Sequence, residues 1–159
     1  MFLIGVYSGQ RFSDYSVFDR SDVRGDFIVK RAKKTKDFSY IPLHAKLLAL
    51  LEKYDWRLPK ITSQKFNLRI QSVCKKLGFD EPIKKTSRKG KDIAVEILPK
   101  RKMVGSHTAR RTYITLAAEK GMARHFIMAV TGIKDSKTLD KYIKLNLENL
   151  FKTSVFVWD

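Results

Sequence analysis

GSHTARRTY, residues 105–113, is the stretch of sequence from which most of the fold and the function can be predicted. Ser106 is a favourable helix N-cap, apolar residues continue the helical run, and Gly121 ends it. His107 and Arg110 are three residues apart, so they share a face of the first turn. Free backbone N–H groups and the positive end of the helix dipole favour an anion there. A proton-transfer group beside a bidentate cation indicates phosphate chemistry, although an ordinary capped helix can carry the same residues.

The composition is that of a basic globular domain. The chain has 159 residues, of which 43% are hydrophobic, enough for one domain with an ordinary core. Its 33 Lys and Arg residues outnumber its 16 Asp and Glu residues, which gives a net charge of +17 at pH 7. Because self-repulsion at this charge opposes folding, a polyanionic partner is expected. The composition alone does not separate DNA from RNA or from an anionic membrane surface.

Cysteine and histidine usage indicates neither disulfides nor a metal site. Cys74 is the only cysteine, and His44, His107 and His125 are far apart in the sequence. No apolar run is long enough to span a membrane, and no secretory signal is visible. We therefore expect a cytoplasmic protein that uses no metal and no cofactor.

The N-terminal part is predicted to contain two helices. Residues 1–7 are apolar enough to end a buried helix, and a second helix begins near Gln10. This second helix carries Arg11 and Asp14, which are three residues apart. The carboxylate can therefore hold the guanidinium in place, or the two side chains form an ordinary surface ion pair.

Residues 26–43 are predicted to form a β-hairpin, because two runs of β-branched and aromatic residues flank a polar segment. The tip of this hairpin carries Lys33, Lys34, Thr35 and Lys36. Such lysines are usually solvated, but they can also bring an ammonium to a phosphate or a leaving oxygen. Two helices are predicted to follow, at residues 44–54 and from Thr62 or Ser63 to Gly78.

A strongly basic segment covers residues 83–104, with a short strand predicted at residues 93–97. Its cations are Lys84, Lys85, Arg88, Lys89, Lys91, Lys100, Arg101 and Lys102. Two interpretations are open: a solvated loop, or a loop that follows the phosphates of a nucleic acid.

Two short helices and an apolar tail are predicted for the C-terminal part. One helix covers residues 124–130, and Ser136 is expected to cap another, which carries Tyr142 beside an apolar stripe. A tyrosine at such a boundary is normally half-buried. Residues 147–159 are so apolar that we expect them to dock on this domain or on a neighbouring copy.

Taken in order, four short motifs resemble the catalytic domain of the tyrosine recombinases, which include phage integrases, Xer-type resolvases and conjugative-transposon integrases. SGQRFSD, residues 8–14, matches the T-G-x-R-x-x-[DE] box of that family. Lys34 and Thr35, followed by Ile-Pro-Leu, match its K-T turn and I-P-L strand, and HTAR, residues 107–110, matches H-x-x-R. Gly132, with Tyr142 downstream, matches the G-H-x(8)-Y ending. Each box alone is weak evidence, whereas four in this order are specific.

The resemblance covers nearly the whole chain and implies a mainly α domain with a small antiparallel β-sheet, an α+β fold. Hairpin 26–43 and strand 93–97 are expected to form that sheet. Family members also carry a core-binding domain, and often an arm-binding domain, that this sequence lacks. We therefore expect residues 1–159 to be a single catalytic domain from a longer protein, with residues 147–159 as a docking tail.

The resemblance also implies the role of each site residue. Tyr142 would attack a DNA phosphodiester and form a 3′-phosphotyrosine, while Arg11 and Arg110 would bind the non-bridging oxygens. Lys34 would protonate the departing 5′-oxygen, and His107 would accept or relay the tyrosine proton. Supporting or less certain positions are Asp14, Thr35, Ile133 and Lys134. Lys33 and Lys36 are alternatives to Lys34 as the acid that protonates the departing oxygen. The catalytic residues Arg11, Lys34, His107 and Arg110 should converge on one basic groove.

The implied partner is double-stranded DNA at an attachment or recombination site, in the cytoplasm and nucleoid of a bacterium. The residues expected to bind DNA are Lys33, Lys36, Lys84, Lys85, Arg88, Lys89, Lys100, Arg101, Lys102 and Arg111. A full-length protein would act as a tetramer on DNA, joined in part through the tail, with no membrane involved.

One position departs from the pattern of the family. The residue after the glycine is usually His or Trp and donates a hydrogen bond to the scissile phosphate, but this chain has Ile133, which cannot donate. Lys134 is the neighbouring residue that can replace it. A non-catalytic DNA-binding module of the same fold is therefore the alternative function. An RNA-binding protein is a third possibility, but it predicts stacking aromatics on a sheet, whereas the aromatics here follow buried patterns.

Overall fold

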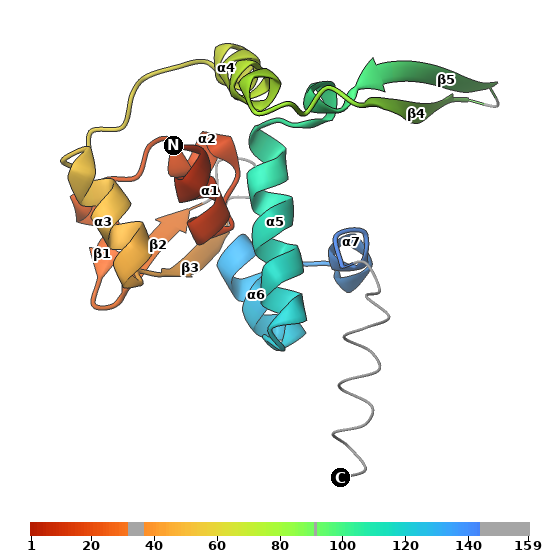
Figure 1. Cartoon of the computed structure of the whole chain (residues 1–159). Helices are drawn as coiled ribbons and strands as arrows, with labels where there is room; N and C mark the ends of the chain where they lie inside the picture. The colour runs from red at the N-terminus through yellow and green to blue at the C-terminus, as the bar shows by residue number, and fades with distance from the viewer. Residues whose placement is uncertain (32–36, 91, 144–159) are drawn as a thin grey trace, which may run out of the picture. The chain divides into compact units, whose positions relative to one another are not determined.

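The computed structural model describes residues 1–31, 37–90 and 92–143, and the chain divides into two compact units (Figure 1). The larger unit comprises residues 1–59 and 109–159, and the smaller unit comprises residues 60–108. Most regular structure in the described residues is helical, and two small antiparallel sheets accompany it. The fold is therefore α+β, as the sequence predicts.

The larger unit places helices around a three-stranded sheet. Its elements, in chain order, are α1 (Phe2–Ser8), α2 (Phe12–Tyr15), η1 (Arg20–Asp22), β1 (Val23–Arg24), β2 (Phe27–Arg31), β3 (Phe38–Pro42), α3 (Ala45–Lys53), α5 (Ser106–Glu119), α6 (Arg124–Thr131) and α7 (Ser136–Asp140). The first three residues of α5 belong to the smaller unit. Helix α6 lies against β3, and α1 lies against α3.

The predicted hairpin at residues 26–43 is confirmed. Strands β2 and β3 pair antiparallel with Ile28 opposite Ile41, and both side chains are completely buried. Strand β1 adds a short third strand beside β2. The alternation of apolar and polar residues fixes this register, because a shift by one residue would move Ile28 and Ile41 to the solvent face. The hairpin tip with Lys33, Lys34, Thr35 and Lys36 lies outside the described residues, as does the tail at residues 147–159.

The smaller unit corrects one prediction about the sheet. Its elements are α4 (Ser63–Lys76), β4 (Pro82–Lys89), β5 (Asp92–Pro99) and η2 (Lys100–Met103). The strand predicted at residues 93–97 lies in β5, but it pairs with β4 in a separate two-stranded sheet, not with the first hairpin. The basic residues 83–89, expected as a loop, form β4. They show no hydrophobic alternation, since a two-stranded ribbon buries little of either face.

The helix ends agree with the sequence in part. Thr62 caps α4 as predicted, since its hydroxyl accepts a hydrogen bond from the Lys65 amide at 3.3 Å. Ser106 is the first residue of α5, not the residue before it, and its amide donates to Asn67 Oδ1 at 2.7 Å.

Asp135, not Ser136, caps α7. Its carboxylate accepts hydrogen bonds from the amides of Lys137 and Thr138, each at 3.1 Å. An ionised carboxylate is a better acceptor than a hydroxyl for two amides at the positive end of a helix. The helix ends at Asp140, so Tyr142 lies in the turn that follows. The sequence-based expectation that Tyr142 lies within the helix is therefore wrong.

Two glycines with left-handed backbones allow a matched test of packing in the larger unit. Gly9 has φ +66°, and a Cβ there would lie 2.6 Å from the Tyr113 ring. Gly25 has φ +56°, and in the described part of the chain no heavy atom would lie within 4 Å of its Cβ. Both residues therefore carry the same backbone constraint, but only Gly9 lacks space for a side chain.

We expect Gly9→Ala to lower the free energy of unfolding more than Gly25→Ala does. Both variants strain a left-handed backbone, at about 1–2 kcal/mol, and only Gly9→Ala adds overpacking of about 1–3 kcal/mol. Urea unfolding followed by circular dichroism measures both. Equal losses in the two variants would contradict the close approach of the Tyr113 ring to Gly9.

Candidate functional site

Arg110 is a buried cation at the centre of the candidate site. Only 1% of its surface is exposed, and one terminal nitrogen donates a hydrogen bond to the Gly9 carbonyl at 3.1 Å. Its Nε is also buried and has no hydrogen-bond partner among the described residues. Burial lowers the pKa of the guanidinium to about 10, and the nearby positive charge of Arg11 contributes to this decrease. Arg110 therefore stays protonated at neutral pH, with bonding capacity left for an anion.

Arg11 is the second cation of the site, and Asp14 lies behind it. Arg11 is the N-cap residue of α2, and its guanidinium lies 4.0 Å from the Asp14 carboxylate, which is almost completely buried. This is the pair that the three-residue spacing predicts. Since the charges of Arg11 and Asp14 both act on the pKa of Arg110, the structure brings these three residues together. An anion that binds both guanidiniums would offset their mutual repulsion.

Gln10 is a site-building residue that the sequence analysis missed. Its side chain is almost completely buried, and its amide nitrogen donates a hydrogen bond to the Val130 carbonyl near the end of α6. This bond ties the loop that carries Arg11 to the turn at Gly132. A buried polar side chain needs such a partner, but a glutamine inside a motif gives no signal in the sequence that it will be buried.

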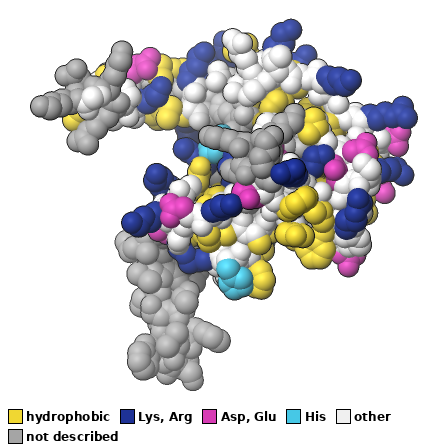
Figure 2. Space-filling view, turned by 180° about the vertical axis from the view of Figure 1, so that it is seen from behind, with side chains coloured by type: hydrophobic (Ala, Val, Ile, Leu, Met, Phe, Trp, Pro, Cys, Tyr) yellow, Lys and Arg dark blue, Asp and Glu magenta, His cyan; other side chains and the backbone are white. Residues whose placement is uncertain are grey.

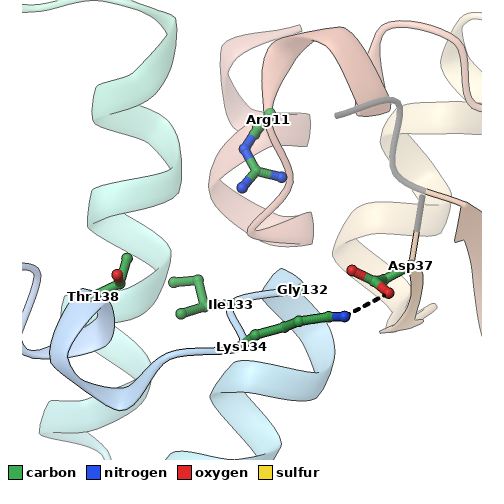
Figure 3. A pocket seen from close by; sticks show the side chains of 6 residues that line it. All are labelled: Arg11, Asp37, Gly132, Ile133, Lys134 and Thr138. Carbon is green, nitrogen blue, oxygen red and sulfur yellow. Dashed lines mark ion pairs between the residues drawn. The ribbon is translucent and has the colours of Figure 1, made fainter. Parts of the chain in front are cut away.

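The turn after α6 forms one wall of a pocket. Gly132 ends the helix with φ +65°, and a Cβ there would lie 2.8 Å from Ser39 Oγ, so any side chain would clash with β3. The pocket has a volume of about 380 Å³ (Figure 3). It is lined by Arg11, Asp37, Gly132, Ile133, Lys134 and Thr138.

Ile133 and Lys134 point in different directions from this turn. Ile133 is 6% exposed and packs in an apolar cluster with residues of α5, α6 and α7. Lys134 extends toward solvent, and its Nζ lies 2.9 Å from Asp37 Oδ1 (Figure 3). The position at which the recombinase pattern has a ring donor is therefore an apolar wall of the pocket.

Tyr142 lies next to the cluster and close to the arginines. The side chain is half-buried, as predicted, and packs against the cluster that contains Ile133. The guanidinium carbon of Arg111 lies 5.9 Å from the centre of the Tyr142 ring. The backbone carbonyl of Tyr142 accepts a hydrogen bond from Thr115 Oγ1 at 3.4 Å. Tyr142 is not among the described residues that line the pocket, although it lies near enough to act on the pKa of Arg110.

Two predicted catalytic residues are not placed relative to this site. His107 is exposed in the first turn of α5, three residues before Arg110, and belongs to the smaller unit. Lys34 lies outside the described residues, together with Lys33, Thr35 and Lys36. Arg11 lies near enough to Arg110 to act on its pKa, but Arg110 is not among the described residues that line the pocket. The convergence of Arg11, Lys34, His107 and Arg110 on one basic groove therefore stays a prediction.

The predicted DNA-binding residues of the smaller unit fall into two groups. Lys84 and Lys85 lie exposed on β4, which also contains Arg88 and Lys89, and Lys102 is exposed in η2. Lys100 instead contacts Glu81, with Nζ 3.3 Å from Oε1, and lies over the Phe79 ring, while Arg101 pairs with Asp80.

Arg111 is an exposed cation of the larger unit. On the face shown in Figure 2, Lys and Arg side chains are spread over much of the surface, with fewer acidic side chains among them. Such an excess of cations suits a polyanionic partner.

Neither a metal cluster nor a membrane-spanning helix is present in the part of the chain that the structure describes. There, no group of three or more His, Cys, Asp or Glu side chains could hold a metal ion. None of the helices described combines the length and the apolar character that crossing a membrane requires.

Comparison with solved structures shows which known proteins have a similar fold. No protein-family model and no curated protein sequence matches the chain. The structure is similar to XerA recombinase, with TM-score 0.65 and 18% identity over 97% of this chain and 61% of that one. It is similar to the Tn1549 transposon integrase in complex with circular intermediate DNA, with TM-score 0.62 and 14% identity over 96% of this chain and 55% of that one.

A third similar structure is the lambda integrase tetramer bound to a Holliday junction, with TM-score 0.62 and 18% identity over 90% of this chain and 41% of that one. The chain thus spans between 41% and 61% of the length of these three proteins. Identities this low are evidence for the fold and not for the activity. The chain has the fold of the tyrosine recombinase catalytic domain.

Proposed function

We propose that this chain is the catalytic domain of a site-specific DNA recombinase or integrase, which cleaves and rejoins DNA through a 3′-phosphotyrosine without metal or ATP. The observation that carries the proposal is the buried Arg110 beside Arg11, each at the position where the recombinase motifs place an arginine. Buried arginines that serve only stability are normally paired with carboxylates. Among the described residues, the Arg110 guanidinium donates its hydrogen bond to a neutral carbonyl, and the Asp14 carboxylate that acts on its pKa lies next to Arg11 as well. One carboxylate beside two guanidiniums leaves positive charge for a ligand.

A phosphodiester suits this arrangement. Two guanidiniums can bind the non-bridging oxygens and offset the charge that develops on them as the phosphorus becomes pentacoordinate. Two positioned guanidiniums can supply the charge that a bound cation supplies in other phosphoryl-transfer enzymes. Asp14 holds Arg11 from its buried side, so that less side-chain freedom is lost when the phosphate binds.

The reaction needs one nucleophile and one acid. The oxygen of Tyr142 attacks phosphorus, the bond from phosphorus to the 5′-oxygen breaks, and the departing oxygen takes a proton from Lys34. His107 accepts or relays the proton of the tyrosine. Because the phosphotyrosine keeps the energy of the broken bond, a 5′-hydroxyl of another strand can reverse the step without ATP.

The proposed partner is double-stranded DNA at a recombination site. The net charge of +17 and the exposed cations on β4 and η2 support a polyanionic partner. The similar Tn1549 and lambda integrase structures contain DNA, and the lambda integrase is a tetramer, so we propose both for the protein that contains this chain. We also propose that residues 147–159 join neighbouring copies in that tetramer.

A DNA-binding module without catalysis is the second candidate function. The observation that favours it is the burial of Ile133, which leaves no ring donor at the position where the recombinases have one. Such a module would bind the same DNA through the same cations but would form no covalent bond. A covalent assay therefore separates the two functions.

Tyr142→Phe is expected to abolish the covalent protein–DNA adduct on a nicked suicide duplex whose sequence is selected by binding from a random pool. The nucleophilic oxygen is lost, while the ring and its packing stay in place. The measurement is adduct yield on a denaturing gel. Tyr40→Phe, which removes an exposed hydroxyl on β3, is the matched control and should leave the yield unchanged. An adduct that survives Tyr142→Phe would exclude Tyr142 as the nucleophile.

Arg110→Lys is expected to slow adduct formation by about two to three decades at saturating DNA, since one ammonium cannot replace a planar guanidinium that bonds both Gly9 and a phosphate. The loss should appear in the single-turnover rate more than in DNA affinity, because the contact strengthens in the transition state. A parallel measurement of unfolding in urea checks that the variant is folded. A folded Arg110→Lys variant with a native rate would contradict the role of Arg110.

The double substitution Lys84→Ala and Lys85→Ala is expected to weaken the salt dependence of DNA binding. Each lost phosphate contact removes about 0.9 from the slope of log K against log salt, so two contacts remove about 1.8. Fluorescence anisotropy between 50 and about 200 mM salt measures the slope. Lys53→Ala, which removes an exposed lysine at the end of α3, should leave the slope unchanged. An unchanged slope in the double variant would show that β4 does not follow the phosphates.

A further inference from the structure

Lys134 and Asp37 form an ion pair at the edge of the pocket that Arg11 lines. The Lys134 ammonium lies 2.9 Å from Asp37 Oδ1, and both residues line that pocket together with Arg11 (Figure 3). The two residues come from separate segments, since Lys134 follows the turn at Gly132 and Asp37 directly precedes β3. Figure 3 shows this pair across the pocket from the Arg11 side chain.

A phosphate in this pocket has room for a further hydrogen-bond donor beside the Gly132 turn, and the residue directly after Gly132 cannot provide one. Ile133 directly follows Gly132, but its side chain is committed to the apolar cluster with Ile114 and Leu139. A phosphate in the pocket would meet the Arg11 guanidinium on one side and a hydrocarbon wall at Ile133. Among the described residues, Lys134 follows the Gly132 turn and lines this pocket with a positively charged side chain.

We propose that Lys134 is a phosphate-binding residue of the cleavage reaction and that Asp37 is the positioning residue that holds its ammonium at the pocket. This inference rests on the proposed function and deepens it, since it names the third cation at the scissile phosphate. An ammonium has three N–H donors, so one bond to Asp37 leaves two for phosphate oxygens. The pair repeats the arrangement of Arg11 and Asp14, in which a carboxylate holds a cation that faces the same pocket.

The exposure of the pair argues for positioning and against a role in stability. The Lys134 side chain is 73% exposed and that of Asp37 is 32% exposed. Exposed ion pairs contribute about 0–1 kcal/mol to folding, so loss of this pair should leave the fold intact. The pair still restricts a long and flexible side chain to one region, which lowers the entropy lost when a phosphate binds.

The test is a double-mutant cycle with Lys134→Ala, Asp37→Asn and both together, on the selected nicked duplex. We expect Lys134→Ala to lower the single-turnover adduct rate about 10- to 100-fold at saturating DNA, as loss of a charge-assisted hydrogen bond does. Asp37→Asn should lower the rate about 3- to 10-fold with the DNA half-saturation point little changed, and Asp37→Glu should restore part of it. In the Lys134→Ala background, Asp37→Asn should have no further effect. Lys137→Ala, an exposed lysine on α7 outside the pocket, is the control.

Three outcomes of the rate measurements would overturn the inference. A native rate in Lys134→Ala would exclude the phosphate contact, and an equal loss from Asp37→Asn in both backgrounds would give Asp37 a structural role. A faster rate in Asp37→Asn would mean that Asp37 competes with phosphate for the lysine.

Failure of the proposed function looks different, because adducts would then be absent from the native chain or would survive Tyr142→Phe. If the native chain binds DNA without adducts, Lys134→Ala must still remove about 0.9 from the salt slope, and an unchanged slope overturns the contact.

Discussion

The hydrogen bond from the Arg110 guanidinium to the Gly9 carbonyl joins residues 101 positions apart and is the constraint on which the candidate site depends. It requires Gly9 to lie against α5, where the Tyr113 ring leaves no room for a side chain. It also brings Arg11 close to Arg110, because Arg11 is two residues beyond Gly9. Two like charges held this near each other, one of them buried, cost free energy that an anion can return.

The segments around this bond are held by contacts that add precision to it. Gln10 bonds the Val130 carbonyl and so links the Arg11 loop to the turn at Gly132. That turn directs Ile133 into the apolar cluster and Lys134 toward Asp37. Catalytic groups that must be held within a fraction of an ångström need this kind of support from buried neighbours. The site is thus built from segments that each have a separate structural reason for their position.

Much of this could be predicted from the sequence, because the deciding residues obey local rules. The hairpin at residues 26–43 follows from alternation and turn composition, and the pairing of Arg11 with Asp14 follows from their spacing. The partner of strand 93–97 could not be predicted, since β4 carries lysines and an arginine in place of an apolar pattern and its pairing depends on backbone bonds. The ion pair of Lys134 with Asp37 could not be predicted either, because no spacing rule for helices or strands connects residues so far apart in the sequence. Gln10 was missed for the same reason.

The central claim is that Tyr142 becomes covalently bonded to DNA. The most direct measurement is mass spectrometry of the adduct formed on a nicked suicide duplex, after digestion with nuclease and protease. Our account predicts a nucleotide 3′-phosphate on the peptide that contains Tyr142, together with a free 5′-hydroxyl on the released strand. A phosphate on any other residue, or a released strand with a 5′-phosphate, would contradict it.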